Sequence, residues 1–274
     1  MKSYRAPLFG DLPPAIKMIL VANIAVFLLD LAFGSQLNLT DVFALHAPQS
    51  DLFRPMQVVT YMFLHGGVSH IFFNMFAFVV FGRVLETVWG SKRFMLYYFV
   101  TGVGAALIQM LVTYIPLDHL HQQIVAFRNT PDPDTLTLIV REHLSHPRSW
   151  VNDLVMAFSE HPNDPQLMQA AYSLVEQIYK LKVDVPTVGA SGAVFGVLLA
   201  FGMMFPNVQL MLLFPPIPIK AKFLVIGYGL IELFACVMPQ ASDNVAHFAH
   251  LGGMLFGFFL IRYWNKKGDL NQYF

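Results

Sequence analysis

Six apolar stretches divide this chain, and each approaches the length at which a helix crosses a lipid bilayer. A transmembrane helix needs about 20 mainly apolar residues. The hydropathy pattern predicts such helices at Ile16–Phe33, Ser69–Val88, Phe94–Ile115, Thr187–Phe205, Lys222–Met238 and Val245–Trp264. We therefore expect an all-α, polytopic membrane protein built as a bundle of six transmembrane helices.

A long polar segment separates the third predicted span from the fourth. Residues 116–184 include Pro, Asn and Asp clusters at 129–134 and 161–165, which are turn signals. Gln166–Leu181 repeats apolar residues at helical spacing and predicts an amphipathic surface helix. We interpret residues 1–274 as a single membrane domain with this partly helical insertion. The insertion could contact substrate, bind a partner or the membrane surface, or be an elaborated loop.

Basic residues orient the predicted bundle. If the N-terminus is cytoplasmic, Lys and Arg of the short connections gather at cytoplasmic ends, and Arg54 alone lies in a short outer loop. This bias predicts cytoplasmic N- and C-termini and an extracytoplasmic insertion. Because no cleavable signal peptide is evident, the pattern suits a bacterial inner membrane.

Composition agrees with a membrane location. Hydrophobic residues make up 56% of the chain, charged residues 12%, and the formal net charge is zero. The mean hydropathy of +0.55 is too high for an ordinary soluble domain. A neutral chain gives no reason to expect a nucleic-acid partner. The single cysteine, Cys236, excludes an internal disulfide framework and a multi-cysteine metal site.

Two polar residues stand inside apolar stretches at similar predicted depth. Ser191 lies near the outer end of the fourth span and His247 near the outer end of the sixth. Ionisable groups are costly in a bilayer and usually functional. Since serine needs a base to become a nucleophile, we predict Ser191 as nucleophile and His247 as general base. The alternative for Ser191 is helix packing, because Gly192 and Gly196 form a G-x-x-x-G pair.

The sixth span carries a second histidine and a small-residue face. His250 follows His247 by three residues, so the two resemble half a metal site. No carboxylate or cysteine lies nearby in that span, and we expect neither a metal nor a cofactor. Gly253 and Gly257 predict close packing of the sixth span against the fourth.

The second span adds polar groups at the same outer end. His70 and Asn74 share a helical face. Acyl transfer requires donors positioned where oxyanion charge develops. We predict that both side chains, with the backbone N–H of Ser191, form an oxyanion hole. His65 is expected to bond backbone in a loop, and Glu86 to make a structural ion pair or interhelical hydrogen bond.

Together these residues resemble the rhomboid family of intramembrane serine proteases. The resemblance rests on four motifs: the Gly-x-Ser-Gly at 189–192, the histidine that begins the last span, the His-x(4)-His-x(3)-Asn of His65, His70 and Asn74, and the Gly-x-x-x-Glu of Gly82 and Glu86.

The resemblance implies a Ser-His dyad without an acidic third member. Phe195 would pack against the catalytic histidine, with Gly189 and His65 in supporting positions. The implied substrates are single-span membrane proteins, cut in or near their transmembrane helix. The fifth span would flank the side through which substrate enters.

Two other function classes remain as alternatives. A non-catalytic rhomboid-like protein would bind membrane clients, but such a protein is expected to lack the serine or the histidine. A small-solute transporter would show two related halves, and no internal repeat is visible here.

Overall fold

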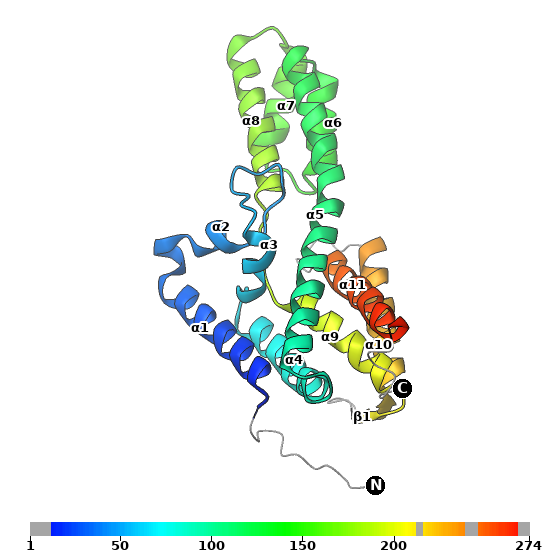
Figure 1. Cartoon of the computed structure of the whole chain (residues 1–274). Coiled ribbons are helices and arrows are strands. Elements are labelled where there is room, and N and C mark those ends of the chain that lie inside the picture. The colour runs from blue at the N-terminus through cyan, green and yellow to red at the C-terminus, as the bar shows by residue number, and fades with distance from the viewer. Residues whose placement is uncertain (1–11, 212–215, 239–245, 268–274) are drawn as a thin grey trace. The chain divides into compact units, whose positions relative to one another are not determined.

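The computed structural model describes residues 12–211, 216–238 and 246–267. Val245, the expected start of the sixth span, lies outside these ranges, as do the basic residues of the first 11 positions. Apart from one short hairpin, the described elements are helices (Figure 1). In chain order they are α1 Pro14–Leu37, α2 Leu39–Phe43, α3 Gln57–Thr60, the 3₁₀ turn η1 Tyr61–Phe63, α4 Val68–Trp89, α5 Ser91–Asn129, α6 Pro133–His143, α7 Ser149–Glu160, α8 Pro165–Val183, α9 Ser191–Met204, α10 Ala221–Val237 and α11 His247–Lys266.

The hairpin lies between α9 and α10. Strands β1 (Gln209–Met211) and β2 (Pro218–Lys220) are antiparallel, with Leu210 opposite Ile219. This pair is too short to form a layer of its own.

The chain divides into two compact units. The first contains Met1–Leu45, Arg54–Gln109 and Thr187–Phe274, and the second contains His46–Phe53 and Met110–Pro186. Helix α5 contributes to both. In the first unit α9 packs against α4 and α11, and α10 packs against α9 and α11 (Figure 1).

Glu86 anchors the start of α1. Its two carboxylate oxygens accept the backbone N–H groups of Ala15 and Ile16, each at 2.8 Å, and one oxygen also accepts the Ser91 hydroxyl. These N–H groups belong to the first turn of α1, where no helical acceptor exists. The interhelical hydrogen bond expected for Glu86 is confirmed, and it holds α1 against α4.

Apolar side chains on the outside of the first unit identify a lipid-facing surface. On α10, Phe223, Ile226, Leu230 and Phe234 are each more than half exposed. Within the described residues α1, α4 and α5 are long and apolar enough to cross a membrane, and α9 is a shorter apolar helix. Exposed apolar patches of this kind are unfavourable in water and favourable in lipid. The protein is an integral membrane protein; the count of six spans stays a prediction.

The second unit has its own core. Two turn signals were correct: Asp132 caps α6 and Asp164 caps α8, each through its side-chain oxygens. The amphipathic helix is confirmed as α8, although Leu181 is exposed rather than buried. The buried residues come from α5 to α8: Leu120, Ile124, Phe127, Leu136, Ile139, Val140, Val151, Phe158, Ala171, Leu174, Val175 and Ile178.

Two of the differences in helix boundaries have a clear physical reason. Helix α5 continues through Pro116 to Asn129 instead of ending near Ile115. Burial of Leu120, Ile124 and Phe127 in the second unit's core favours the longer helix despite the hydrogen bond that proline removes. Helix α9 begins at Ser191 rather than Thr187, because Thr187 pairs with Leu45 in an extended bridge.

Candidate active site

Ser191 is the first residue of α9, and the turn before it requires glycine. Gly189 has φ +124°, a conformation that L side chains rarely adopt. An added Cβ there would also lie 2.8 Å from Nε2 of His70. The Gly189 N–H donates to the Tyr61 carbonyl at 2.9 Å, which fixes the turn. The glycine therefore allows the chain to enter α9 with the His70 ring alongside.

His250 is the histidine that contacts Ser191. Its Nε2 lies 2.8 Å from Ser191 Oγ, and its ring stacks on Phe195 with centroids 4.2 Å apart and planes 10° from parallel. His250 is 6% exposed. The stacked ring leaves the imidazole little freedom to turn away from the serine.

The expected pairing of Ser191 with His247 needs correction. Helix α11 begins at His247, and the His247 Nδ1 lies 2.6 Å from Oε2 of Glu232 on α10. One turn further along, His250 meets α9. His250, for which no catalytic role was expected, thus contacts the serine, whereas His247, the expected base, faces α10.

Glycines bring α9 and α11 together at this point. A Cβ on Gly253 would lie 1.9 Å from the Gly192 carbonyl oxygen, so the two backbones are in direct contact. The predicted pairing of these helices through small residues is confirmed. Gly196 instead faces Thr101, and Gly257 faces Tyr97, both on α5. Close contact at Gly192 and Gly253 sets the distance between Ser191 and His250.

A carboxylate that the sequence interpretation overlooked completes the cluster. Oε2 of Glu232 lies 2.9 Å from His250 Nδ1 as well as 2.6 Å from His247 Nδ1. Glu232 is thus the close partner of both imidazoles. Glu232 is 6% exposed. The rule that an ionisable group within a span is functional by default would have found it.

Glu232 also changes the expectation about metals. We expected none because the sixth span has no carboxylate, but α10 supplies one. Three residues each offer one ligand atom, and these atoms all lie within 4.8 Å of one another: Glu232, His247 and His250. The three side chains therefore have the spacing of a candidate metal centre.

His70 reaches the site from α4. Its Nδ1 accepts the Gly66 N–H at 3.3 Å, and its Nε2 faces Gly189. A neutral histidine that accepts at Nδ1 carries its proton on Nε2. This tautomer directs an N–H donor toward the turn that precedes Ser191.

Asn74 and His65 lie close to His70 in the chain. Asn74 is one turn further along α4 and is 7% exposed. The His65 ring packs edge-on against the His70 ring with centroids 5.1 Å apart. The His65 ring also interacts with the backbone of Phe63, as expected of this loop residue. The ring contact supports the position of His70.

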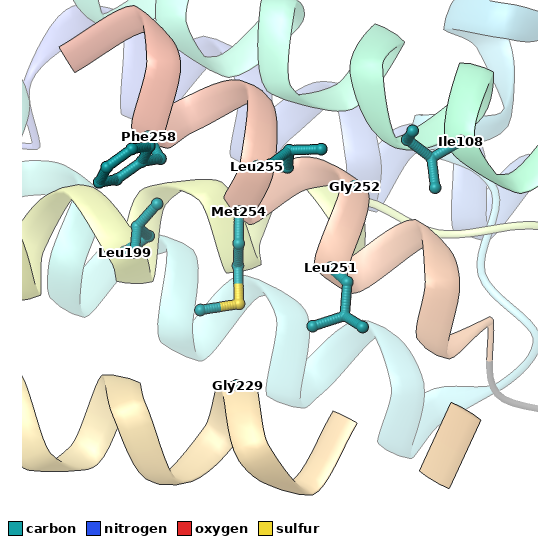
Figure 2. Close-up of a pocket in the computed structure, with 8 residues that line it drawn as sticks. All are labelled: Ile108, Leu199, Gly229, Leu251, Gly252, Met254, Leu255 and Phe258. Carbon is teal, nitrogen blue, oxygen red and sulfur yellow. The ribbon is translucent and has the colours of Figure 1, made fainter. Parts of the chain in front are cut away.

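An apolar cleft is lined in part by Leu251, the residue that follows His250 in the chain (Figure 2). It has a volume of about 380 Å³ between α5, α9, α10 and α11, and Figure 2 shows Met254 extending from α11 toward α10 at Gly229. Its lining is apolar: Ile108, Leu199, Gly229, Leu251, Gly252, Met254, Leu255 and Phe258. Without polar groups to orient a reacting atom, the cleft carries no chemistry itself.

Comparison with known proteins adds independent information. Residues 52–115 and 166–266, more than half of the chain, match the model of the Rhomboid domain. Rhomboid protein 1, mitochondrial, of Saccharomyces cerevisiae is 33% identical over 81 residues, which are 30% of this chain and 23% of that protein. YdcA of Bacillus subtilis, named as a proposed rhomboid protease, is 34% identical over 67 residues, 24% of this chain and 32% of that protein. The aligned segments thus cover a third or less of either relative.

Proposed function

Since this chain belongs to the rhomboid family, we propose that it is an intramembrane serine endopeptidase. It hydrolyses peptide bonds in or near the transmembrane segments of single-span membrane proteins. The observation that carries the proposal is the 2.8 Å contact between Ser191 Oγ and His250 Nε2, made beneath an apolar exterior. A serine hydrolase requires at least a serine hydroxyl and an unprotonated imidazole nitrogen within about this distance.

The reaction begins with proton transfer from Ser191 to His250. As Oγ attacks the scissile carbonyl, Nε2 of His250 takes the hydroxyl proton and later delivers it to the leaving amine. The Glu232 carboxylate, 2.9 Å from Nδ1, stabilises the imidazolium that forms. This assignment replaces His247 by His250 as the base and adds an acidic partner to the expected dyad.

The proposed oxyanion hole is formed by groups at the N-terminal ends of α9 and α4. Ser191 opens α9, so its backbone N–H has no acceptor within the helix. The Nε2–H of His70 and the amide of Asn74 supply side-chain donors from the first two turns of α4. Both helices direct their positive ends toward the developing negative charge, which stabilises it further.

The length of α9 supports a site below the membrane surface. Fourteen residues extend about 21 Å, against about 30 Å for the hydrocarbon core. If α9 reaches the inner face, Ser191 therefore lies within the bilayer thickness. The apolar cleft beside α10 supports entry of a substrate helix from that side.

The remaining assignments belong to the same proposal. The chain is a single rhomboid-like membrane domain with six spans and residues 116–184 as an extracytoplasmic insertion. Both termini face the cytoplasm of a bacterium whose inner membrane holds the protein. Beyond the lipid bilayer, its partners are its membrane-protein substrates, and hydrolysis by these side chains calls for no cofactor.

A cleavage assay with point variants tests the proposal. Purified protein is mixed with a fluorescent single-span reporter in detergent micelles and in liposomes. S191A and H250A should each lower the cleavage rate roughly 10⁴-fold or more, while H247A keeps measurable cleavage. Labelling of Ser191 by a fluorophosphonate should likewise depend on His250.

Three outcomes would reject the assignment. Full cleavage by S191A excludes Ser191 as the nucleophile. Loss of cleavage in H247A together with retention in H250A restores the base to His247. If folded wild-type protein binds the reporter but neither cleaves it nor reacts with the fluorophosphonate, the chain is a client-binding protein instead.

A further inference from the structure

We propose that Glu232, His247 and His250 bind a divalent transition-metal ion of the zinc type, and that the bound ion switches Ser191 off. The second half of this inference rests on the proposed protease function. The first half rests on the three side chains alone, which come from the facing parts of α10 and α11.

The spacing of the ligand atoms suits zinc after a small adjustment. Zinc binds histidine nitrogen at about 2.0–2.1 Å and carboxylate oxygen at about 2.0–2.2 Å, so tetrahedral ligand atoms lie about 3.3 Å apart. The Glu232 oxygen is now 2.6 Å from His247 Nδ1 and 2.9 Å from His250 Nδ1. The three ligand atoms lie within 4.8 Å of one another, so an ion fits once Oε2 retreats by less than about 1 Å and the imidazoles adjust to the same spacing.

The ligand atoms of the three residues converge on one small volume. Oε2 of Glu232 lies 2.6 Å from His247 Nδ1 and 2.9 Å from His250 Nδ1, and the side chains involved are largely buried. Ligand atoms of a metal centre are arranged in this way, because their lone pairs converge on the ion rather than on each other. A cation placed between them keeps the carboxylate charge balanced.

The ligand types favour a transition metal over magnesium or calcium. Two imidazoles and one carboxylate form a nitrogen-rich set, which suits zinc, copper or nickel, whereas magnesium and calcium select oxygen ligands. Three protein ligands leave a fourth position for water. The His247 side chain is 16% exposed, so an ion can reach the site past its ring.

Metal binding and proton transfer compete for the same imidazole. When Nδ1 of His250 coordinates an ion, the neutral ring carries its proton on Nε2. Nε2 then donates to Ser191 Oγ and can no longer accept the hydroxyl proton. The ion also occupies the Glu232 carboxylate, which removes the counter-charge for an imidazolium. Occupancy of this site therefore stops the first chemical step.

Metal binding is measured first, without reference to proteolysis. The purified full chain in detergent is titrated with zinc by calorimetry and with cobalt by visible absorbance, which reports coordination by nitrogen and oxygen. Wild-type protein should bind one equivalent. E232Q and H247A each alter a ligand and should bind at least roughly 10- to 100-fold more weakly, since loss of a residue that only supports a ligand already costs that much. H121A, which removes a histidine of the second unit, serves as the matched control and should bind like wild type.

Cleavage is then measured with and without zinc for each variant. The wild-type rate should fall at least tenfold with a midpoint at the calorimetric dissociation constant, and a chelator should restore it. For H247A the ratio of the two rates should stay near one at the same zinc concentration. This ratio compares each variant with itself, so a change in basal rate does not enter.

The outcomes separate this inference from the proposed function. Absence of zinc and cobalt binding, or equal binding by wild type, E232Q and H247A, overturns the metal site. If zinc binds at these three residues but does not inhibit cleavage, or stimulates it, the proposal that the ion switches Ser191 off is wrong. Site-dependent binding by a protein that never cleaves the reporter rejects the protease proposal and leaves the metal site standing.

Discussion

Gly253→Ala places a methyl group at the closest approach of α11 to α9. An ideal Cβ at this position lies 1.9 Å from the Gly192 carbonyl oxygen and 2.7 Å from the carbonyl carbon. Cβ atoms essentially never approach another heavy atom within 3.0 Å. The two backbones must therefore separate by at least about 1.1 Å, because neither obstructing atom can rotate away as a side chain would.

The separation acts directly on the proposed chemistry. His250 lies one turn before Gly253, and Ser191 immediately precedes Gly192. Moving the helices apart by about 1.1 Å lengthens the contact between Ser191 Oγ and His250 Nε2 from 2.8 Å to as much as about 3.9 Å, beyond hydrogen-bond reach. A misplacement of this size can lower an enzyme's rate about 10²-fold. Overpacking should also lower the free energy of unfolding by about 1–3 kcal/mol.

Gly227 on α10 provides the matched control. No atom lies within 4 Å of a Cβ added there. G227A therefore gains the helical preference of alanine over glycine, about 1 kcal/mol, without a clash. Thermal unfolding in detergent and reporter cleavage are measured for both variants. If G253A melts at the same temperature as G227A and cleaves at the same rate, the reasoning about helix separation is wrong.

Two further variants test the anchors of each unit. E86Q removes one of the charged acceptors for the N–H groups of Ala15 and Ile16 and should lower the free energy of unfolding by about 1–3 kcal/mol; unfolding identical to wild type would show that α1 does not depend on this cap. D132A removes the cap of α6 and should destabilise the second unit by about 1 kcal/mol near neutral pH. The hydroxyl and N–H of Thr135 hold the pKa of the Asp132 carboxyl below its usual value, so the cap contributes fully above the ordinary aspartate pKa of about 3.9 and is lost as pH falls through the lowered pKa. Unfolding of wild type and D132A, followed by circular dichroism across this range, should converge in acid; a constant difference would contradict the assignment.

Local signals in the sequence predicted much of the fold because they act over a few residues. Proline and aspartate at 132–133 and 164–165 place helix starts within one turn, since a cap depends only on its immediate neighbours. The glycines of the fourth and sixth spans predicted close packing because no other residue allows two backbones to touch. Ser191 stood out for a similar reason: a polar group in an apolar run needs a partner.

Identification of that partner required the tertiary structure. Along a helix each residue turns by about 100°, so His247 and His250 point about 60° apart; both reach Glu232, but His250 is the one that contacts Ser191. Which of them meets α9 depends on where α11 starts and on the contact between Gly253 and Gly192. The sequence pattern indicated a histidine at the right depth but not its rotation about the helix axis.

The role of Glu232 likewise depends on how two helices pack. Its sequence position, 15 residues before His247, says nothing about distance in space, and only the packing of α10 against α11 brings its carboxylate to both imidazoles. Helix α5 gives a further example, because core burial in the second unit carries it past Pro116. The sequence by itself determined an apolar helical bundle with a reactive serine. The tertiary structure decided which histidine and which carboxylate accompany that serine, because side-chain partners on different helices are set by helix phase and packing rather than by local pattern.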